Sequence, residues 1–327
     1  ITNVNAVINH VISSPGYVSA DLHLHGINSA DSSYGLENRA RAAIAEGMDL
    51  LVSTDHDFVT DYGPIVEAIG GKPYIGTMVG DEITPLNYGH FSVFPLTPDP
   101  NSPTGGAYDY TYKSSDNAVG VDHDYVQGPG ELFKGVDAAN PGTQVLQMAH
   151  VLDPVFGNLR IAGLVTSTKF ADAPALSTFG DPVKYRMPPN RNSKGGFLPP
   201  YPLGTSDLTS LDFTSLELTI GAYDAHGPTS TNNALFDSAL PTYFNLLNLG
   251  VLSAATGSSD SHVQVKEILG LPRNYVKSSV DPRDGKGNDF DKIADEEFAV
   301  NTNDKHLFVT SGPIVSLNVS TAQTAHA

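Results

Sequence analysis

Short apolar runs that alternate with helical segments constrain the fold of this chain more than any other feature of its sequence. Residues 17–24 (YVSADLHL) alternate as in a β-strand, and residues 36–48 carry apolar side chains at helical spacing up to the break at Gly47. The same patterns predict strands at 50–54, 74–79, 91–96, 144–148, 215–220 and 252–255, and helices at 62–69, 131–139 and 233–249. Repeated alternation of this kind favours an α/β fold with a mostly parallel sheet, which we expect to close into a TIM-like barrel.

Two long segments, residues 97–130 and 153–210, interrupt this rhythm, because they are rich in Gly, Pro, Ser, Asp and Tyr and hold few periodic runs. We expect both to be loop insertions over one face of the barrel, where substrate-shaping elements usually lie. The predicted organisation is an N-terminal extension at 1–16, a barrel with these insertions at 17–305, and at 306–327 a C-terminal β-element or the start of a truncated further domain.

The balance of charges excludes two classes of partner. The 327-residue chain has 36 acidic against 18 basic residues and a formal net charge of -18, so it should repel the nucleic-acid backbone and anionic membrane surfaces. No apolar stretch approaches the roughly 18 residues of a membrane span. We therefore expect a small-molecule substrate, with no nucleic acid and no membrane as partners. The sequence leaves the oligomeric state open.

The chain contains no cysteine, which excludes disulfides and thiolate metal ligands. Any bound metal must then be held by imidazole and carboxylate groups. The sequence begins at Ile1 rather than Met, which favours the removal of an upstream segment. These features favour a periplasmic or secreted location, and a cytoplasmic one is compatible with the same composition.

Histidines recur where the predicted strands end or begin. Six of the eleven do so, in the segments DLHLH, STDHD, YGHFSVF, LQMAH and SSDSH: His23, His25, His56, His90, His150 and His262. Three carboxylates accompany them, namely Asp31, Glu82 and Asp260. Parallel barrels gather functional residues at the carboxyl ends of their strands, so these nine side chains should converge at one mouth. His23 and His25 are two residues apart, so they point to the same face of a strand and can hold one ion together.

Imidazole and carboxylate groups in this pattern predict a metal site with hydrolytic chemistry. Neighbouring divalent ions polarise a substrate oxygen and lower the pKa of bound water from about 15.7 towards 7. Glu82 can bridge two ions with its two oxygens, whereas each imidazole serves one ion and needs a partner for its second nitrogen. Asp55 and Asp57, which flank His56, are candidates for such partners and equally for capping a helix or solvating a loop.

Six segments, taken in order, resemble the PHP (polymerase and histidinol phosphatase) superfamily: DLHLHGINSADS, LLVSTDHD, GDEIT, GHFSVFPL, QVLQMAH and ATGSSDSH. The GHFSVFPL and ATGSSDSH segments and the late LFVTSGPIVSL segment are most similar to its carbaryl-hydrolase-like CehA/McbA branch. The resemblance runs from about Tyr17 to Leu317. It implies a distorted (β/α)7 barrel that binds two or three divalent metal ions, which would be manganese, iron or zinc.

The same resemblance implies how the nine residues share these ions. One ion would be held by His23, His25, Glu82 and Asp260, a second by Glu82, His90 and His150, and a third by Asp31, His56 and His262. Glu82, Asp260 and His262 would take part directly in catalysis. Relatives often follow the strand-end histidine with Pro-Arg, whereas Val151 and Leu152 follow His150 here, and this departure weakens the implied phosphoester substrate.

The predicted reaction is hydrolysis of an ester-like bond, either a phosphoester or an aryl carbamate or ester. Four basic residues of the second long segment would suit a phosphate if they reach inward: Arg160, Arg186, Arg191 and Lys194. Tyr108, Tyr110 and Tyr112 of the first long segment would form an aromatic wall for an aryl group, or pack beneath a surface loop.

Two other functions remain open at this point. An amidohydrolase-type enzyme shares the His-x-His pair, but it normally needs a bridging lysine where this chain has Glu82. A metal-stabilised, non-catalytic binding module of a larger secreted or envelope protein would also keep the nine side chains. Activity against ester, carbamate and phosphoester substrates separates the enzymes from the binding module.

Overall fold

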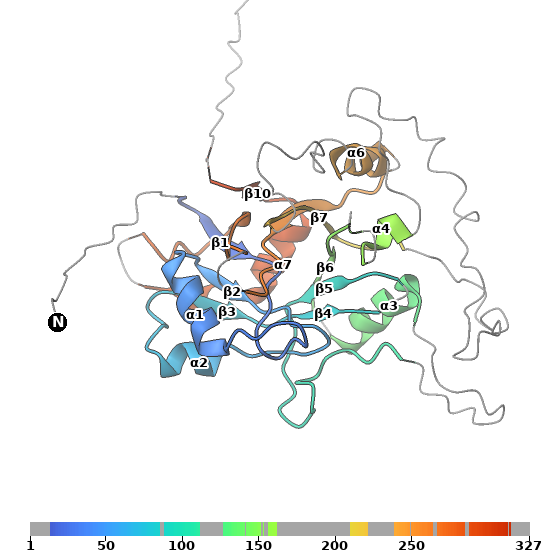
Figure 1. Ribbon diagram of the computed structural model, residues 1–327. Helices are drawn as coiled ribbons and strands as arrows, with labels where there is room; N and C mark the ends of the chain where they lie inside the picture. Colours follow the sequence, from blue (N-terminus) through green and yellow to red (C-terminus); the bar gives the residue numbers. More distant parts are fainter. Residues whose placement is uncertain are drawn as a thin grey trace, which may run out of the picture.

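The computed structural model of the protein describes residues 14–85, 88–111, 127–140, 142–151, 153, 156–161, 210–221, 239–248, 250–263, 267–284, 288–312 and 314. Within these residues, ten strands form two five-stranded sheets, and helices pack against both (Figure 1). The protein therefore has a mixed α/β fold, as the alternating pattern predicts.

The first sheet has β1 at its centre, in the order β10-β9-β1-β2-β3. Its strands are β1 (Tyr17–Asp21), β2 (Leu50–Val52), β3 (Gly76–Met78), β9 (Arg273–Lys277) and β10 (Leu307–Thr310). β1, β2 and β3 run parallel, whereas β9 runs antiparallel to both β1 and β10. The strand-like segment near the end of the chain thus contributes β10 to the same sheet as β1.

The second sheet has the order β4-β5-β6-β7-β8. Its strands are β4 (Asp81–Ile83), β5 (Phe91–Phe94), β6 (Val145–Met148), β7 (Ser215–Ile220) and β8 (Ala254–Ser258). β6, β7 and β8 run parallel, but β5 runs antiparallel to both of its neighbours. The expectation of a mostly parallel sheet is wrong here, because the short connection from Ile83 to Phe91 has no room for the crossover that parallel neighbours require.

Two isolated bridges connect the sheets at one rim. Leu24, after β1, pairs with Ser261, after β8, and His56, after β2, pairs with Glu82 of β4. Backbone hydrogen bonds reinforce both junctions: the His25 N–H donates to the Ser261 carbonyl at 3.0 Å, and the Asp57 N–H donates to the Glu82 carbonyl at 2.9 Å. The described strands therefore form two open sheets that meet at bridges, and their pairing does not show the closed barrel expected from the sequence.

Helices pack on both sheets and leave this rim accessible. α1 (Leu36–Ala45) and α2 (Gly63–Ala68) lie together beside the first sheet, while α3 (Pro129–Ala139) and α6 (Leu240–Asn248) pack on the second (Figure 1). α4 (Asn158–Ile161) follows β6, and a 3-10 turn, η6 (Phe290–Lys292), precedes α7 (Asp295–Asn303). One apolar cluster joins the sheets, since it contains Val18 of β1, Phe94 of β5 and Phe298 of α7.

Periodicity predicts every strand and helix with a clear pattern, but it misses the shortest and most polar ones. β4 has three residues, too few for an alternation, and α7 begins with three consecutive acidic residues. β9 was missed as well. Among the described helices, none combines the length and the hydropathy needed to cross a membrane.

Candidate metal centre

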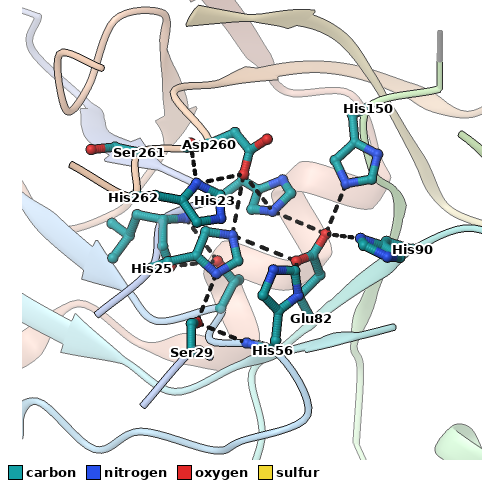
Figure 2. A network of polar contacts seen from close by, with 12 residues as sticks. His23, His25, Ser29, His56, Glu82, His90, His150, Asp260, Ser261 and His262 are labelled. Carbon is teal, nitrogen blue, oxygen red and sulfur yellow. Dashed lines mark hydrogen bonds and ion pairs between the residues drawn. The ribbon is translucent and has the colours of Figure 1, made fainter. Parts of the chain in front are cut away.

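The nine residues singled out in the sequence lie together at the rim where the two sheets meet. His23 and His25 follow β1, His56 follows β2, Asp260 and His262 follow β8, and His150 follows β6. Glu82 belongs to β4, and Asp31 lies in the loop before α1. His90 precedes β5, and because β5 is antiparallel its beginning lies at the same rim. Figure 2 shows five imidazoles directed towards the Glu82 carboxylate.

Glu82 is fully buried at the centre of these rings, and its two oxygens face different sets of them. Oε1 lies 3.1 Å from His23 Nε2, 3.2 Å from His90 Nδ1 and 3.0 Å from His150 Nε2. Oε2 lies 2.8 Å from His56 Nδ1 and 3.5 Å from His25 Nε2. A carboxylate placed in this way can serve two cations at once, one on each oxygen.

Asp260 and Asp31 complete the cluster on the side of the solvent. Asp260 Oδ1 lies 3.2 Å from His25 Nε2 and 3.3 Å from His23 Nε2. Asp31 Oδ2 lies 3.2 Å from the Nε2 atoms of both His56 and His262. The Asp31 side chain is 55% exposed, whereas those of His23 and His25 are 0% exposed, so the cluster extends from the protein interior to its surface.

The donor atoms fit divalent cations. They fall into four overlapping groups in which all ligand atoms lie within 4.8 Å of one another: His25, Asp31, His56 and His262; His23, His25 and Glu82; His23, His150 and Asp260; and His56, Glu82 and His90. Among the described residues, four buried ring nitrogens make no hydrogen bond of good geometry, His23 Nε2, His56 Nδ1, His90 Nδ1 and His150 Nδ1, and the first three lie against the Glu82 carboxylate as ion pairs. Imidazole and carboxylate donors in such numbers suit zinc, manganese or iron.

Opposite charges shift the pKa values of these groups in opposite directions. Burial lowers the pKa of His56, but Glu82 and Asp31 outweigh burial and raise it to about 10. Burial alone would raise the pKa of Glu82, but His23, His90 and His56 hold it well below its usual range. His25 differs, because burial lowers its pKa to about 4. A cation that binds here must therefore displace protons from imidazolium–carboxylate pairs.

Ser29 and Asp55 determine which nitrogen of His25 faces the site. The Ser29 hydroxyl donates to Asp55 Oδ1 at 2.7 Å and lies 2.9 Å from His25 Nδ1. Because the hydroxyl has one hydrogen and gives it to Asp55, the proton between Ser29 and His25 belongs to Nδ1. Nε2 is then left with a lone pair directed at the cluster. Asp55 thus supports the imidazole of His25 through Ser29. Among the hydrogen bonds of the described residues, none joins the Asp55 carboxylate to the ring of His56.

Asp57 supports the backbone rather than a ring. Its carboxylate accepts the Thr84 N–H at 3.0 Å and the Tyr110 hydroxyl at 3.2 Å, which ties the end of β4 to the loop that precedes α3. Asp57 also has a positive φ of 50°. The sequence suggests two roles for Asp57, support of a ligand imidazole or solvation of a loop. Its contacts are those of a residue that stabilises loops.

The turn Asp260-Ser261-His262 is held by a buried arginine that the sequence did not indicate. Arg39 of α1 is 1% exposed and donates from its two terminal nitrogens to the Ser261 Oγ and carbonyl, both at 2.9 Å. Within the turn, His262 Nδ1 lies 2.9 Å from the Asp260 carbonyl, which can only accept. His262 Nε2, which faces Asp31, is therefore the nitrogen available to a cation once the cation has displaced its proton.

Three residues that carry side chains adopt the left-handed backbone region at this rim. They are Asp57, His150 and Asp260, with φ values of 50°, 28° and 50°. Such conformations cost energy in residues other than glycine and persist where the surroundings fix them, which is typical of functional sites.

A cavity of about 470 Å³ opens beside the cluster. Six of the nine residues line it: Asp31, His56, His90, His150, Asp260 and His262. Ala30, Asp57, Thr84, Asp153 and Phe156 complete the lining, so its described part holds no lysine or arginine. The Phe156 ring stacks on His90, with centroids 4.8 Å apart and planes at 26°. The cavity therefore combines polar donors on one wall with an aromatic face on another.

Phe156 provides the aromatic surface of the cavity, and of the two alternatives that the sequence leaves open for the tyrosines, Tyr108 and Tyr110 adopt the packed one. Tyr108 and Tyr110 pack against the apolar core of the second sheet, and neither lines this cavity. Phe156 lies at the start of the second long segment, where no periodic pattern draws attention to it. Tyr112 and the side chains of Arg160, Arg186, Arg191 and Lys194 lie outside the described part of the chain.

No family model and no curated protein matches this sequence. Among solved structures, it is similar to a two-domain protein from Bacteroides vulgatus that contains a predicted PHP-like metal-dependent phosphoesterase, with 14% identity, coverage of 94% of this chain and 69% of the other, and a TM-score of 0.45. PsfC from Pseudomonas syringae matches with 13% identity, 84% and 87% coverage and a TM-score of 0.41. Endonuclease Q bound to a 27-mer duplex with an abasic lesion matches with 12% identity, 81% and 54% coverage and a TM-score of 0.39. These likenesses are too distant to assign a family or an activity.

Proposed function

We propose that this protein is a metal-dependent hydrolase that cleaves an ester-like bond. The observation that supports it most is the convergence of nine imidazole and carboxylate side chains, in groups whose ligand atoms lie within 4.8 Å of one another. Divalent cations at such a site polarise a substrate oxygen and lower the pKa of a coordinated water. The architecture agrees with the proposal, since the two sheets with their bridges are compatible with a distorted, interrupted barrel of the PHP type.

The proposed assignment of ligands is the one that the resemblance to the PHP superfamily implies. His23, His25, Glu82 and Asp260 would hold one cation, Glu82, His90 and His150 a second, and Asp31, His56 and His262 a third. Glu82 suits the shared position because Oε1 faces His23, His90 and His150 while Oε2 faces His25 and His56. We propose two or three cations of manganese, iron or zinc.

Of the three residues implied in catalysis, Asp260 and His262 would act directly on the reacting groups, and Glu82 would act through the cations that it helps to hold. Asp260 and His262 line the cavity, so they can contact the substrate and the attacking water there. Glu82 lies behind them, fully buried, and keeps the imidazoles in place through both oxygens. Thr84 and Asp153 also line the cavity, where they would face a bound substrate.

Within the described lining of the cavity, bound cations would be the only positive groups, and this favours an uncharged ester or carbamate over a phosphate monoester. Four carboxylates line it, Asp31, Asp57, Asp153 and Asp260, and the described lining holds no lysine or arginine. Recognition of a phosphate usually uses the bidentate guanidinium of arginine or the ammonium of lysine. Among the two substrate classes, this lining supports an aryl carbamate or ester.

Removal of metal should abolish hydrolysis, and return of metal should restore it. The protein would be treated with a chelator, analysed for metal and reloaded with Mn²⁺, Fe²⁺ or Zn²⁺. We expect a loss of about a thousandfold or more, because the cations supply several kcal/mol of barrier lowering. Reloaded protein should hydrolyse aryl carbamates and carboxylic esters faster than p-nitrophenyl phosphate. A fully loaded protein that is inert against all three classes would contradict the proposal and favour the binding module.

Replacement of Phe156 by Ala should weaken the binding of aryl substrates. A stacked aromatic pair contributes about 0.5 to 1.5 kcal/mol, so the KM for an aryl carbamate should rise about 2- to 10-fold with little change in kcat. An alkyl carbamate with the same scissile bond is the matched control, and its KM should stay constant. Equal effects on both substrates would show that Phe156 acts on His90 rather than on the substrate.

A further inference from the structure

A buried glutamate of β7 contacts two of the proposed metal ligands. Glu217 is 1% exposed and lies in the middle of the strand, where its sequence context, SLELTI, gives no indication of a functional role. Its carboxylate lies 3.2 and 3.4 Å from His23 Nδ1 and accepts the backbone N–H of His150 at 2.5 Å. A single side chain therefore touches His23 through its ring and His150 through its main chain.

The contact with His23 fixes which ring nitrogen is available to a cation. A carboxylate only accepts hydrogen bonds, so the hydrogen between Glu217 and His23 belongs to Nδ1. Nε2 is then left free of hydrogen once a cation has displaced the second proton, and this atom lies 3.1 Å from Glu82 Oε1 and 3.3 Å from Asp260 Oδ1. Figure 2 shows this nitrogen directed into the cluster.

The contact with His150 fixes a backbone that would otherwise relax. His150 has a φ of 28°, an unfavourable value for a residue with a side chain. The hydrogen bond from its N–H to Glu217 holds this conformation, and in that conformation His150 Nε2 lies 3.0 Å from Glu82 Oε1. Glu217 thus acts on both histidines that meet the same oxygen of Glu82.

We infer that Glu217 is a positioning residue that sets the metal-binding geometry of His23 and His150 together. The inference rests on the proposed function, because it requires that these histidines bind cations. His23 and His150 are assigned to different cations, so the loss of Glu217 should weaken two sites at once. Partners of this kind are known to change metal affinity by about 10- to 100-fold.

Glu217→Gln is the decisive substitution because it keeps the size of the side chain and changes one oxygen into an NH₂ group. If that NH₂ group faces His23 Nδ1, the ring must accept there and carry its hydrogen on Nε2, where it can no longer bind a cation. If the amide is turned round, the NH₂ group meets the His150 N–H, donor against donor. Either orientation removes one of the two contacts that Glu217 makes.

Asp49→Asn is the matched control. Asp49 is also a buried carboxylate, 4% exposed, and it accepts from the Ser19 N–H and hydroxyl at 2.8 Å each and from Arg283. It precedes β2, at the end of that strand away from His56. Its substitution therefore measures the cost of removing a buried carboxylate without touching the cluster.

The experiment measures metal binding and not only turnover. Metal-free wild type, Glu217→Gln and Asp49→Asn are checked for folding by circular dichroism, titrated with Zn²⁺ against a chromophoric chelator, and loaded with Co²⁺ to record the visible absorption. We expect Glu217→Gln to bind Zn²⁺ about 10- to 100-fold more weakly, with an altered Co²⁺ spectrum, while Asp49→Asn matches the wild type. If Glu217→Gln does not fold, Glu217→Asp, which withdraws the carboxylate by one methylene, is read in the same way.

The outcomes separate the two hypotheses. A wild-type protein that binds neither metal overturns the proposed function, and the inference with it. A wild-type protein that binds metal, together with a folded Glu217 variant of unchanged affinity and spectrum, overturns the inference alone. An equal loss in the Asp49→Asn control also overturns it, because the effect would then be general.

Discussion

Glu82→Ala should lower the hydrolytic rate at least about a thousandfold while leaving the fold assembled. Its carboxylate lies within 3.5 Å of nitrogen atoms on five of the proposed ligand imidazoles. Without it the cations lose their shared ligand, and a loss of about 4 kcal/mol or more in barrier lowering follows. The backbone pairing of Glu82 with His56 does not depend on the side chain, so the rim keeps its shape.

The measurements are kcat/KM on an aryl ester, metal content and circular dichroism. Glu82→Gln serves as the isosteric control, since it retains one acceptor oxygen, and it should keep part of the metal while losing most of the activity. The imidazole pKa values give a further readout: burial then acts on His56 without its main opposing carboxylate, so its pKa should fall from about 10. Unchanged turnover in a folded Glu82→Ala protein would rule out the proposed site.

Arg39→Met should destabilise the protein by about 1 to 3 kcal/mol and weaken metal binding about 10-fold. The guanidinium donates two hydrogen bonds to Ser261, between Asp260 and His262, and lies 4.4 Å above the Tyr34 ring. Two effects oppose each other. Without the guanidinium, the buried Ser261 oxygens lose two hydrogen-bond donors, which destabilises the fold. The substitution also removes the cost of burying the Arg39 charge, which stabilises the fold. We expect the first effect to be larger because both hydrogen bonds are short and charge-assisted.

Chemical denaturation and Zn²⁺ titration of the same preparations test this prediction. Arg39→Lys keeps the charge but offers only one compact group of donors, so it should restore stability more than metal affinity. Arg41→Met, on the same helix, removes an exposed arginine whose partner is Glu37 and should change neither quantity. A destabilised Arg39→Met protein with wild-type metal affinity would mean that the turn does not depend on Arg39 for its geometry.

The sequence predicts most of the cluster because most of its histidines occupy positions set by local chain geometry. His23 and His25 alternate with Leu24 on one extended segment, His150 directly follows an apolar run, and His56 follows one after three polar residues. Such positions are visible in the sequence itself, since the end of an apolar run marks the end of a strand. Glu82 is identified by the resemblance of its motif, because β4 is too short to be recognised by its periodicity.

The supporting residues are not predictable in the same way. Arg39 resembles an exposed residue of a charged helix, and Glu217 resembles the polar position of an alternating strand. Arg39 acts on Ser261, which lies 222 positions away in the chain, and Glu217 acts on His23, which lies 194 positions away. The direction of β5 was also missed, because apolar periodicity is the same for parallel and antiparallel strands.

The antiparallel β4–β5 pair has a consequence for how the site assembles during folding. Glu82 and His90 stand on one hairpin, and Glu82 is paired with Ser92, so these two of the nine residues come together through local contacts. Asp260 reaches His23 only after β8 and β1, which belong to different sheets and are far apart in the sequence, have been brought together, and loop closure over such a separation is slow. We therefore expect Glu82 and His90 to come together before Asp260 joins them, and a cation held there early would favour the docking of the segment after β8 against the segment after β1.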